Sequence, residues 1–203
     1  MFYRIEDGHG LPHDPFSAIV SPRPIAWISS QDSQGRGNLA PYSFFTAVAY
    51  SPPQVVISSV GGKVDRATGK DSISNIRETG VFCINIAGRD DAPRLNASSA
   101  PYPAATDEAQ ALSIPMAPCH AIVGQRVADA PAALECRLQQ IVPLEGEQNF
   151  LMIANVVAVH LDDAYLTTEG RFDVTRYAPL ARLGYLDFTS VETVFPLKRP
   201  KLD

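Results

Sequence analysis

The sequence predicts a mainly β chain with short helices, an α+β protein built as a β-barrel with helical excursions. Several short runs of apolar and β-branched residues, typical of strands, recur along the 203 residues. A single segment, residues 73–79, carries both a start and a stop signal for a helix. Many strands with one clear helix favour a barrel. Because 45% of the residues are hydrophobic, the chain has enough apolar side chains to form one buried core. We therefore expect one domain over residues 1–203.

The first predicted element is a β-hairpin. Residues 25–30 are largely apolar and follow Pro22 and Pro24. Proline and the residue before it avoid the helical region, so this run is expected to be a strand. Residues 32–37 contain two glycines and have the composition of a turn. The turn leads to a second strand over residues 39–45, which completes the hairpin.

A third strand and the helix follow. Residues 54–59, Gln-Val-Val-Ile-Ser-Ser, begin directly after a pair of prolines and are expected to form a strand. For the helix over residues 73–79, either Asp71 or Ser72 is expected to be the N-cap. Gly80 stands at its end, where a left-handed residue is favoured.

Three further strands are predicted after the helix. Residues 81–86 read as a strand, and residues 88–112, rich in Ala, Asp and Pro, are expected to form short helices or a loop. Residues 134–142 alternate apolar and polar side chains, which places Cys136 in the core. Residues 150–161 are almost continuously apolar, which predicts a long strand covered on both faces.

Charge and composition favour a cytoplasmic protein that binds a small molecule. The net charge of −5 and the isoelectric point near 5.3 argue against nucleic acid, and no run of basic residues indicates a membrane partner. There is no apolar run of about 20 residues, and residues 1–8 include acids where a signal peptide would be apolar. Cys83, Cys119 and Cys136 are widely separated and predict neither a disulfide framework nor a metal site.

The segment Gly69-Lys70-Asp71-Ser72 is a candidate phosphate site. A cation, a hydroxyl and the free N–H groups of a helix start together satisfy an anion. The alternative is a plain N-cap beside a solvated lysine. We expect Asp71 to cap the helix or to pair with a cation, since its carboxylate would otherwise repel a phosphate.

Residues 38–43, Asn-Leu-Ala-Pro-Tyr-Ser, are a candidate site for a flat ring. Ala40 and Ser43 are small enough to let a ring approach the backbone, and Asn38 and Tyr42 offer polar partners. The alternative is a bent edge strand in which proline blocks ladder pairing. A ligand with a flat apolar end and a phosphorylated end would use both segments, and flavin mononucleotide (FMN) has that shape.

No catalytic residue is predicted. The chain has no Gly-x-Ser-x-Gly elbow, and neither Gly61-Gly-Lys63 nor Gly69-Lys-Asp-Ser72 has the spacing of a P-loop. The four histidines are far apart in sequence. His160 ends a buried strand and is expected to be structural, although a reductase could use it as a proton donor.

Six ordered segments resemble the flavin reductase-like family, which has the FMN-binding split-barrel fold and includes flavoredoxin-type proteins. They lie within residues 14–200, which would form the core of the domain. The segments are residues 22–29 (PRPIAWIS), 38–45 (NLAPYSFF), 52–58 (PPQVVIS), 70–80 (KDSISNIRETG), 134–137 (LECR) and 181–184 (ARLG).

This resemblance implies a homodimeric, Greek-key-like split barrel with FMN bound noncovalently near the subunit interface. FAD is a possible substitute, and NAD(P)H or a protein donor would reduce the flavin by hydride transfer. The electrons would pass to free flavin or to a monooxygenase partner. The alternative is a flavoredoxin-like electron carrier that does not oxidise NAD(P)H. The residues implied in cofactor binding are Arg23, Lys70 and Ser72 for the phosphate, Asn38, Ala40, Pro41, Tyr42 and Ser43 around the ring, and Ser58 and Ser59 along the ribityl chain.

Three segments depart from the family pattern. Residues 107–114 lack the expected aromatic residue and glycine, and residues 153–156 stand where a Gly-Glu-Val-like turn is common. Tyr185 occupies a position where a second glycine is frequent. These segments are expected to shape the mouth of the pocket, so they bear on the substrate more than on the cofactor.

Overall fold

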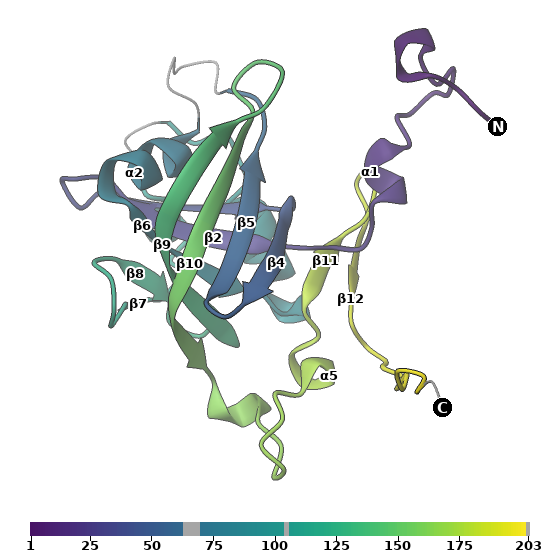
Figure 1. Ribbon diagram of the computed structural model, residues 1–203. Coiled ribbons are helices and arrows are strands. Elements are labelled where there is room, and N and C mark those ends of the chain that lie inside the picture. The colour runs from purple at the N-terminus through teal and green to yellow at the C-terminus, as the bar shows by residue number, and fades with distance from the viewer. Residues whose placement is uncertain (63–69, 104–105, 202–203) are drawn as a thin grey trace.

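The computed structural model describes residues 1–62, 70–103 and 106–201. Its centre is a seven-stranded antiparallel sheet, in the order β3-β2-β6-β9-β10-β5-β4, which curls on itself as an open barrel (Figure 1). The strands of this sheet are β2 (Ala26–Gln31), β3 (Gly37–Tyr42), β4 (Phe45–Tyr50), β5 (Pro53–Ser59), β6 (Val81–Ile86), β9 (Ala132–Pro143) and β10 (Phe150–Leu161).

Two small sheets and several short helices surround the barrel. The three-stranded sheet has the order β1-β11-β12, and β7 pairs with β8. These strands are β1 (Arg23–Pro24), β7 (Met116–Pro118), β8 (Gln125–Val127), β11 (Leu180–Arg182) and β12 (Phe188–Ser190). The α-helices are α1 (Phe16–Ile19), α2 (Asp71–Thr79), α3 (Ala92–Ala97), α4 (Glu108–Ala111) and α5 (Val174–Tyr177), and single 3₁₀ turns span Ile5–Asp7, Arg89–Asp91 and Asp163–Tyr165.

Apolar side chains form two buried clusters, one on each side of the β2–β6 region. The cluster inside the barrel includes Ile28, Ile57, Phe82, Ile84 and Met152, and α2 closes it with Ile73 and Ile76. The second cluster lies outside the barrel wall, beneath α3, α4 and the β7–β8 hairpin, and includes Trp27, Leu39, Leu95, Ile114 and Val127. Alternation along β2 divides its side chains between the two clusters.

The predicted hairpin and helix are present. β2 and β3 pair antiparallel with Ala26 opposite Tyr42. Helix α2 ends at Gly80, whose φ of 71° is left-handed and whose N–H donates to the Ile76 carbonyl. The expected N-cap is wrong: the cap position is Lys70, without a side-chain cap, and the helix starts two residues before the predicted range.

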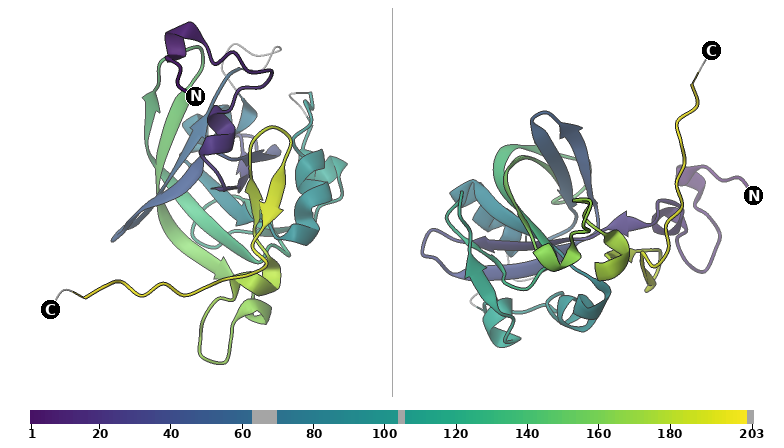
Figure 2. Two further views of the ribbon diagram at one scale, coloured as in Figure 1. Left: turned by 90° about the vertical axis from the view of Figure 1, so that its right-hand side faces the viewer. Right: turned by 90° about the horizontal axis from the view of Figure 1, so that it is seen from below.

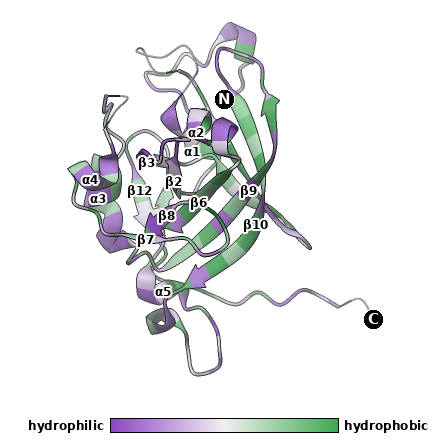
Figure 3. Cartoon of the chain, turned by 90° about the vertical axis from the view of Figure 1, so that its left-hand side faces the viewer, coloured by the Kyte–Doolittle hydropathy of each residue, from purple (hydrophilic) through white to green (hydrophobic). Residues whose placement is uncertain are grey.

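Two strand predictions need correction. The chain turns after β3 and begins a separate strand, β4, at Phe45, so residues 39–45 are not one strand. The C-terminal end of strand β10 is not covered on both faces in this chain, because Val157, Val159 and Leu161 are 40%, 56% and 46% exposed. Much of β10 is coloured green, for hydrophobic residues, in Figure 3.

Both ends of the chain extend away from the barrel (Figure 2). Phe2, Phe195 and Leu197 are exposed there. Among the described residues, no helix is both long enough and apolar enough to cross a bilayer.

Candidate functional site

A cavity of about 330 Å³ lies between strand β3, the start of helix α2 and the segment after helix α3; we call it the β3–α2 cavity. Six of the ten residues predicted from sequence line it: Asn38, Ala40, Pro41, Tyr42, Lys70 and Ser72. Gly69 of the predicted phosphate segment lies outside the described residues. The structure therefore brings the two candidate segments together at one cavity.

Asn38 and Ser72 join β3 to the helix. The Asn38 amide donates a hydrogen bond to the Ser72 hydroxyl over 2.8 Å, and both side chains are buried. Asn38 is opposite Ser30 in the β2–β3 ladder, which fixes where its side chain emerges. A hydroxyl that already accepts from an amide keeps its own proton available for donation. Ser72 can therefore donate into the cavity.

Tyr42 supplies a buried hydroxyl at the same cavity. Among the described residues, none makes a well-oriented hydrogen bond to it, although the Ser59 and Ser72 hydroxyls lie near it. Burial raises the pKa of Tyr42 to about 12, so the phenol stays protonated at neutral pH. A buried polar atom without a full partner is uncommon in folded proteins. It fits a ligand that supplies the missing hydrogen bond.

Lys70 places positive charge at the helix start. Its ammonium lies 5.6 Å from the centre of the Tyr42 ring. The first N–H groups of an α-helix have no intrahelical acceptor, and the helix dipole is positive at that end. Asp71 also lines the cavity and is the first residue of α2. Lysine, serine and helix N–H groups together make this end of the cavity suited to an anion.

The far wall of the cavity is the segment after α3, which the sequence did not single out. It consists of Ser98, Ser99, Ala100 and Pro101. The Trp27 indole donates to the Ser98 hydroxyl over 2.9 Å, which ties this segment to strand β2. The small side chains leave room beside the backbone, as a flat ligand requires.

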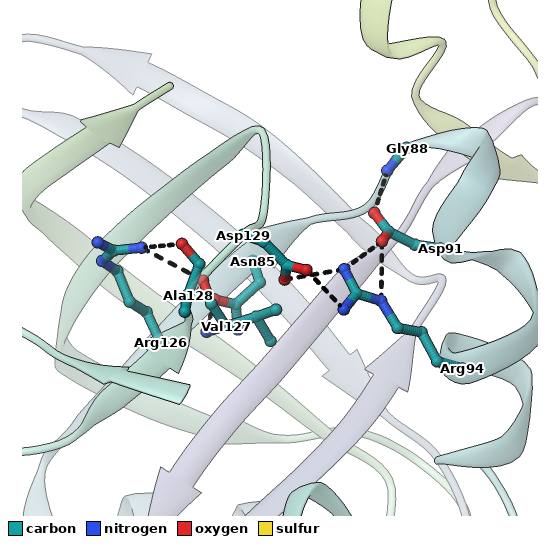
Figure 4. Close-up of polar contacts among 8 residues, drawn as sticks. All are labelled: Asn85, Gly88, Asp91, Arg94, Arg126, Val127, Ala128 and Asp129. Atoms are coloured by element: carbon teal, nitrogen blue, oxygen red, sulfur yellow. Dashed lines mark hydrogen bonds and ion pairs between the residues drawn. The ribbon is translucent and has the colours of Figure 1, made fainter. Parts of the chain in front are cut away.

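Helix α3 is fixed by an arginine between two aspartates (Figure 4). Arg94 Nε donates to Asp91 over 2.9 Å, and its two terminal nitrogens reach both oxygens of Asp129 at 3.0 and 2.9 Å. Burial alone would lower the pKa of Arg94, but the two carboxylates raise it. Asp91 in turn accepts from the Gly88 N–H at 2.7 Å. This network holds the wall of the cavity in place.

Glu108 is a further residue that sequence reasoning missed. It is buried, lines the cavity and accepts a hydrogen bond from the Leu39 N–H at 2.9 Å. The available signal was Asp107, whose side chain caps helix α4 by accepting from Ala109 and Gln110. An N-cap predicts the start of a helix, but it does not predict which strand that helix contacts.

The remaining predicted residues lie elsewhere. Arg23 and Ser43 line a neighbouring cavity of about 300 Å³, which we call the arginine cavity, and this separates Arg23 from Lys70 and Ser72. Pro41 and Ser99 line both cavities, so the two adjoin. Ser58 and Ser59 line neither; Ser59 is buried near the Tyr42 hydroxyl, and the Ser58 N–H donates to the Phe44 carbonyl.

The chemistry of the β3–α2 cavity fits FMN. One end carries a lysine and a helix start for a phosphate, and the other has small residues and a proline for a flat ring. Between them, the Tyr42 hydroxyl has no well-oriented partner in the described part of the chain. Among the described residues, no cluster of His, Cys, Asp or Glu could hold a metal ion.

The chain is similar in sequence and in structure to several known proteins. A Deinococcus radiodurans protein described as uncharacterised is 40% identical over 158 residues, which cover 75% of this chain and 68% of that protein. The 2-nitrobenzoate 2-nitroreductase of Pseudomonas fluorescens is 29% identical, with a TM-score of 0.80 and coverage of 91% and 88%. Nitrilotriacetate monooxygenase component B of Bacillus cereus is 27% identical, with a TM-score of 0.82 and coverage of 90% of each chain.

The fold and its cavity define a split-barrel protein of the flavin reductase type. A further solved structure, described as having a split barrel domain, aligns with a TM-score of 0.82 at 19% identity, which shows the fold. The family model described as "Flavin reductase like domain" matches residues 19–180. The chain belongs to that family.

Proposed function

We propose that this protein is an FMN-binding oxidoreductase, an NAD(P)H-dependent flavin reductase that passes electrons to free flavin or to a monooxygenase partner. Membership of the flavin reductase-like family supports flavin chemistry. Similarity to a monooxygenase component supports the choice of partner. The observation that carries the proposal is the β3–α2 cavity, where six residues expected at an FMN site meet.

The residues have separate tasks in this proposal. Lys70, the Ser72 hydroxyl and the first N–H groups of α2 would bind the phosphate. Ala40, Pro41 and Tyr42 would border the ring, and Asn38 would orient Ser72 through their hydrogen bond. When bound, FMN supplies the hydride-accepting chemistry that no side chain of this site provides. The protein's part is to bind and orient, so no strong acid or base is needed.

The test is a visible absorption spectrum followed by an anaerobic titration. Purified protein saturated with FMN should be yellow, and NADH or NADPH should bleach the flavin band within seconds to minutes. FMN at the same concentration without protein is the control. A protein that stays colourless after incubation with FMN would contradict the proposal.

A flavoredoxin-like electron carrier is the alternative within the same family. It would bind FMN equally well, but neither nicotinamide would bleach it, whereas a chemical reductant such as dithionite would. FAD in place of FMN in the same titration tests whether the cavity accepts the larger flavin.

The proposal includes a homodimer. The C-terminal end of β10 exposes Val157, Val159 and Leu161, and β4, two strands along the same sheet, exposes Val48. Grouped exposed apolar residues are typical of an interaction surface. The chain ends that extend from the barrel would add contacts to a second copy (Figure 2).

A further inference from the structure

The arginine cavity contains two positive charges and no ionic partner for either of them among the described residues. Arg23 and Arg182 are directly opposite each other in the β1–β11 ladder. Like charges in that arrangement are unfavourable. Arg23 is only 7% exposed, and its Nε has no hydrogen-bond partner within residues 1–62, 70–103 and 106–201. Burial, together with the nearby charge of Arg182, lowers the pKa of Arg23.

The two arginines differ in how much of each guanidinium the protein uses. Arg23 donates to the carbonyls of Ser17, Val20 and Leu183, the last two at 2.6 and 2.8 Å. Arg182 donates to the Tyr185 carbonyl and lies 4.4 Å from the centre of the Phe188 ring. Five N–H donors are available on a guanidinium. Arg182 therefore keeps donors for a ligand, while Arg23 is held in place as a buried charge behind it.

The rest of the cavity combines apolar and aromatic residues with three serines and an asparagine. Ile25 and Leu95 are buried in its floor, and Tyr185 and Phe188 stand on its wall. Planar guanidinium groups match carboxylates in two parallel hydrogen bonds. Aromatic walls favour a flat apolar body attached to that carboxylate. The volume of about 300 Å³ is at the small end of ligand pockets.

The backbone conformation of Tyr185 is an independent indication that the arginine cavity is a binding site. Its φ of 57° lies in the left-handed region, which glycine adopts without strain and a bulky residue rarely does. The sequence has tyrosine here where glycine is frequent in the family that it resembles. An aromatic ring is thus held at the cavity wall in a conformation that costs backbone energy, and such outliers gather at functional sites.

We propose that the arginine cavity binds a small aromatic carboxylate, with Arg182 as the partner of the carboxylate and Tyr185 as a wall for the ring. Because Pro41 and Ser99 are shared with the β3–α2 cavity, this ligand would lie beside the flavin. The position of this ligand beside the flavin rests on the proposed function, whereas its binding does not.

The test is calorimetric titration with three probes: benzoate, its neutral counterpart benzamide, and acetate, which has no ring. Benzoate should bind at least tenfold more tightly than either of the others. Equal binding of benzamide would overturn the role of the charge, and equal binding of acetate would overturn the role of the ring.

Variants locate the site. Arg182→Gln should weaken benzoate binding at least tenfold, whereas Arg199→Gln in the exposed tail should not change it. Tyr185→Gly should weaken benzoate binding without lowering the Tm by more than a few degrees, because glycine adopts this backbone conformation freely. Unchanged benzoate binding by Arg182→Gln or by Tyr185→Gly would overturn the assignment.

FMN titration of the same samples separates this proposal from the proposed function. Arg182→Gln should retain FMN affinity, because Arg182 does not line the β3–α2 cavity. Failure of the wild-type protein to bind FMN would contradict the proposed function alone. Failure to bind benzoate in a protein that binds FMN would contradict the carboxylate site alone.

Discussion

The buried hydroxyl of Tyr42 is a group whose removal should affect ligand binding without lowering the stability of the fold. Its ring packs in the barrel core, while its hydroxyl lacks a well-oriented partner among the described residues. Removing an unsatisfied polar group does not cost a native hydrogen bond. Under the proposed function, this polar atom would serve the ligand more than the fold.

We predict that Tyr42→Phe weakens FMN binding by about 0.5–1.5 kcal/mol, the value of one hydrogen bond, and leaves the free energy of unfolding unchanged or slightly higher. Flavin fluorescence titration and urea unfolding measure the two effects. Tyr165→Phe, outside the cavity, is the matched control and should change neither. A drop in stability without a loss of affinity would contradict this role.

Lys70 is the cation at the same site. We predict that Lys70→Ala weakens FMN binding by about 1.5–3 kcal/mol, the value of a charged hydrogen bond, which is tenfold or more in Kd. The Tm should fall by no more than about a few degrees, since the Lys70 side chain is only partly buried. Lys198→Ala, in the exposed C-terminal segment, removes the same charge as a control. The phosphate assignment is wrong if both variants bind FMN alike.

At the scale of elements, Glu135 fastens the β7–β8 hairpin to the barrel. Its carboxylate is fully buried and accepts from the N–H groups of His120, Ala121 and Ile122 at 2.7, 2.6 and 3.0 Å. His160 Nε2 lies 2.6 Å from the same carboxylate. Alternation along β9 predicted that Glu135 faces away from Cys136, but not that a hairpin covers it.

This network makes stability depend on pH. Burial acts to raise the pKa of Glu135, but the N–H groups of His120 and Ala121 and the His160 ring outweigh it and lower that pKa to about 2. Because the folded pKa is below the ordinary 4.5, the carboxylate stabilises the fold above that pH and loses this effect as pH falls toward 2. The contribution is on the order of 3 kcal/mol.

We predict that Glu135→Gln lowers the free energy of unfolding at pH 7 by about 2–4 kcal/mol and flattens its decline between pH 4.5 and 2. Urea unfolding over that pH range measures both effects. Glu147→Gln, exposed in the β9–β10 turn, should behave as the wild type. If the free energy of unfolding of Glu135→Gln falls as steeply with pH as that of the wild type, other carboxylates cause the decline.

At the scale of the whole molecule, the exposed end of β10 conflicts with its sequence. An almost continuously apolar strand is expected to be covered on both faces. Toward the end of this strand, His160 contacts the buried carboxylate of Glu135, whereas Val159 and Leu161 on the opposite face are 56% and 46% exposed. A second copy of the chain would cover this open face, and the sequence pattern would then reflect the assembly, whereas the exposure reflects the single chain.

We predict that the wild-type protein has the mass of a dimer by light scattering, about twice 22.0 kDa, and that Val159→Glu is monomeric. A buried unpaired carboxylate at an apolar interface is costly enough to prevent association. Val123→Glu, the same change at an exposed position off this face, should remain dimeric. A monomeric wild type would exclude the homodimer, and a dimeric Val159→Glu would move the interface elsewhere.

The sequence by itself determined the features that depend on neighbours in the chain. Prolines, glycines and side-chain periodicity located the β2–β3 hairpin, β5, β6, β9, β10 and the end of α2, because these signals act through local backbone geometry. The ordered motifs also identified the family. Within the site, both segments that contribute most of the predicted residues were recognisable in advance.

Only the tertiary structure decided which residues, distant in the sequence, lie close together. Ser99 and Glu108 reach the cavity from beyond α3, and Arg182 comes to lie opposite Arg23 although 159 positions separate them. The separate strand β4, the open face of β10 and the absence of a side-chain cap on α2 also depend on packing. Local propensity does not encode such distant contacts, because burial and charge compensation depend on the whole barrel.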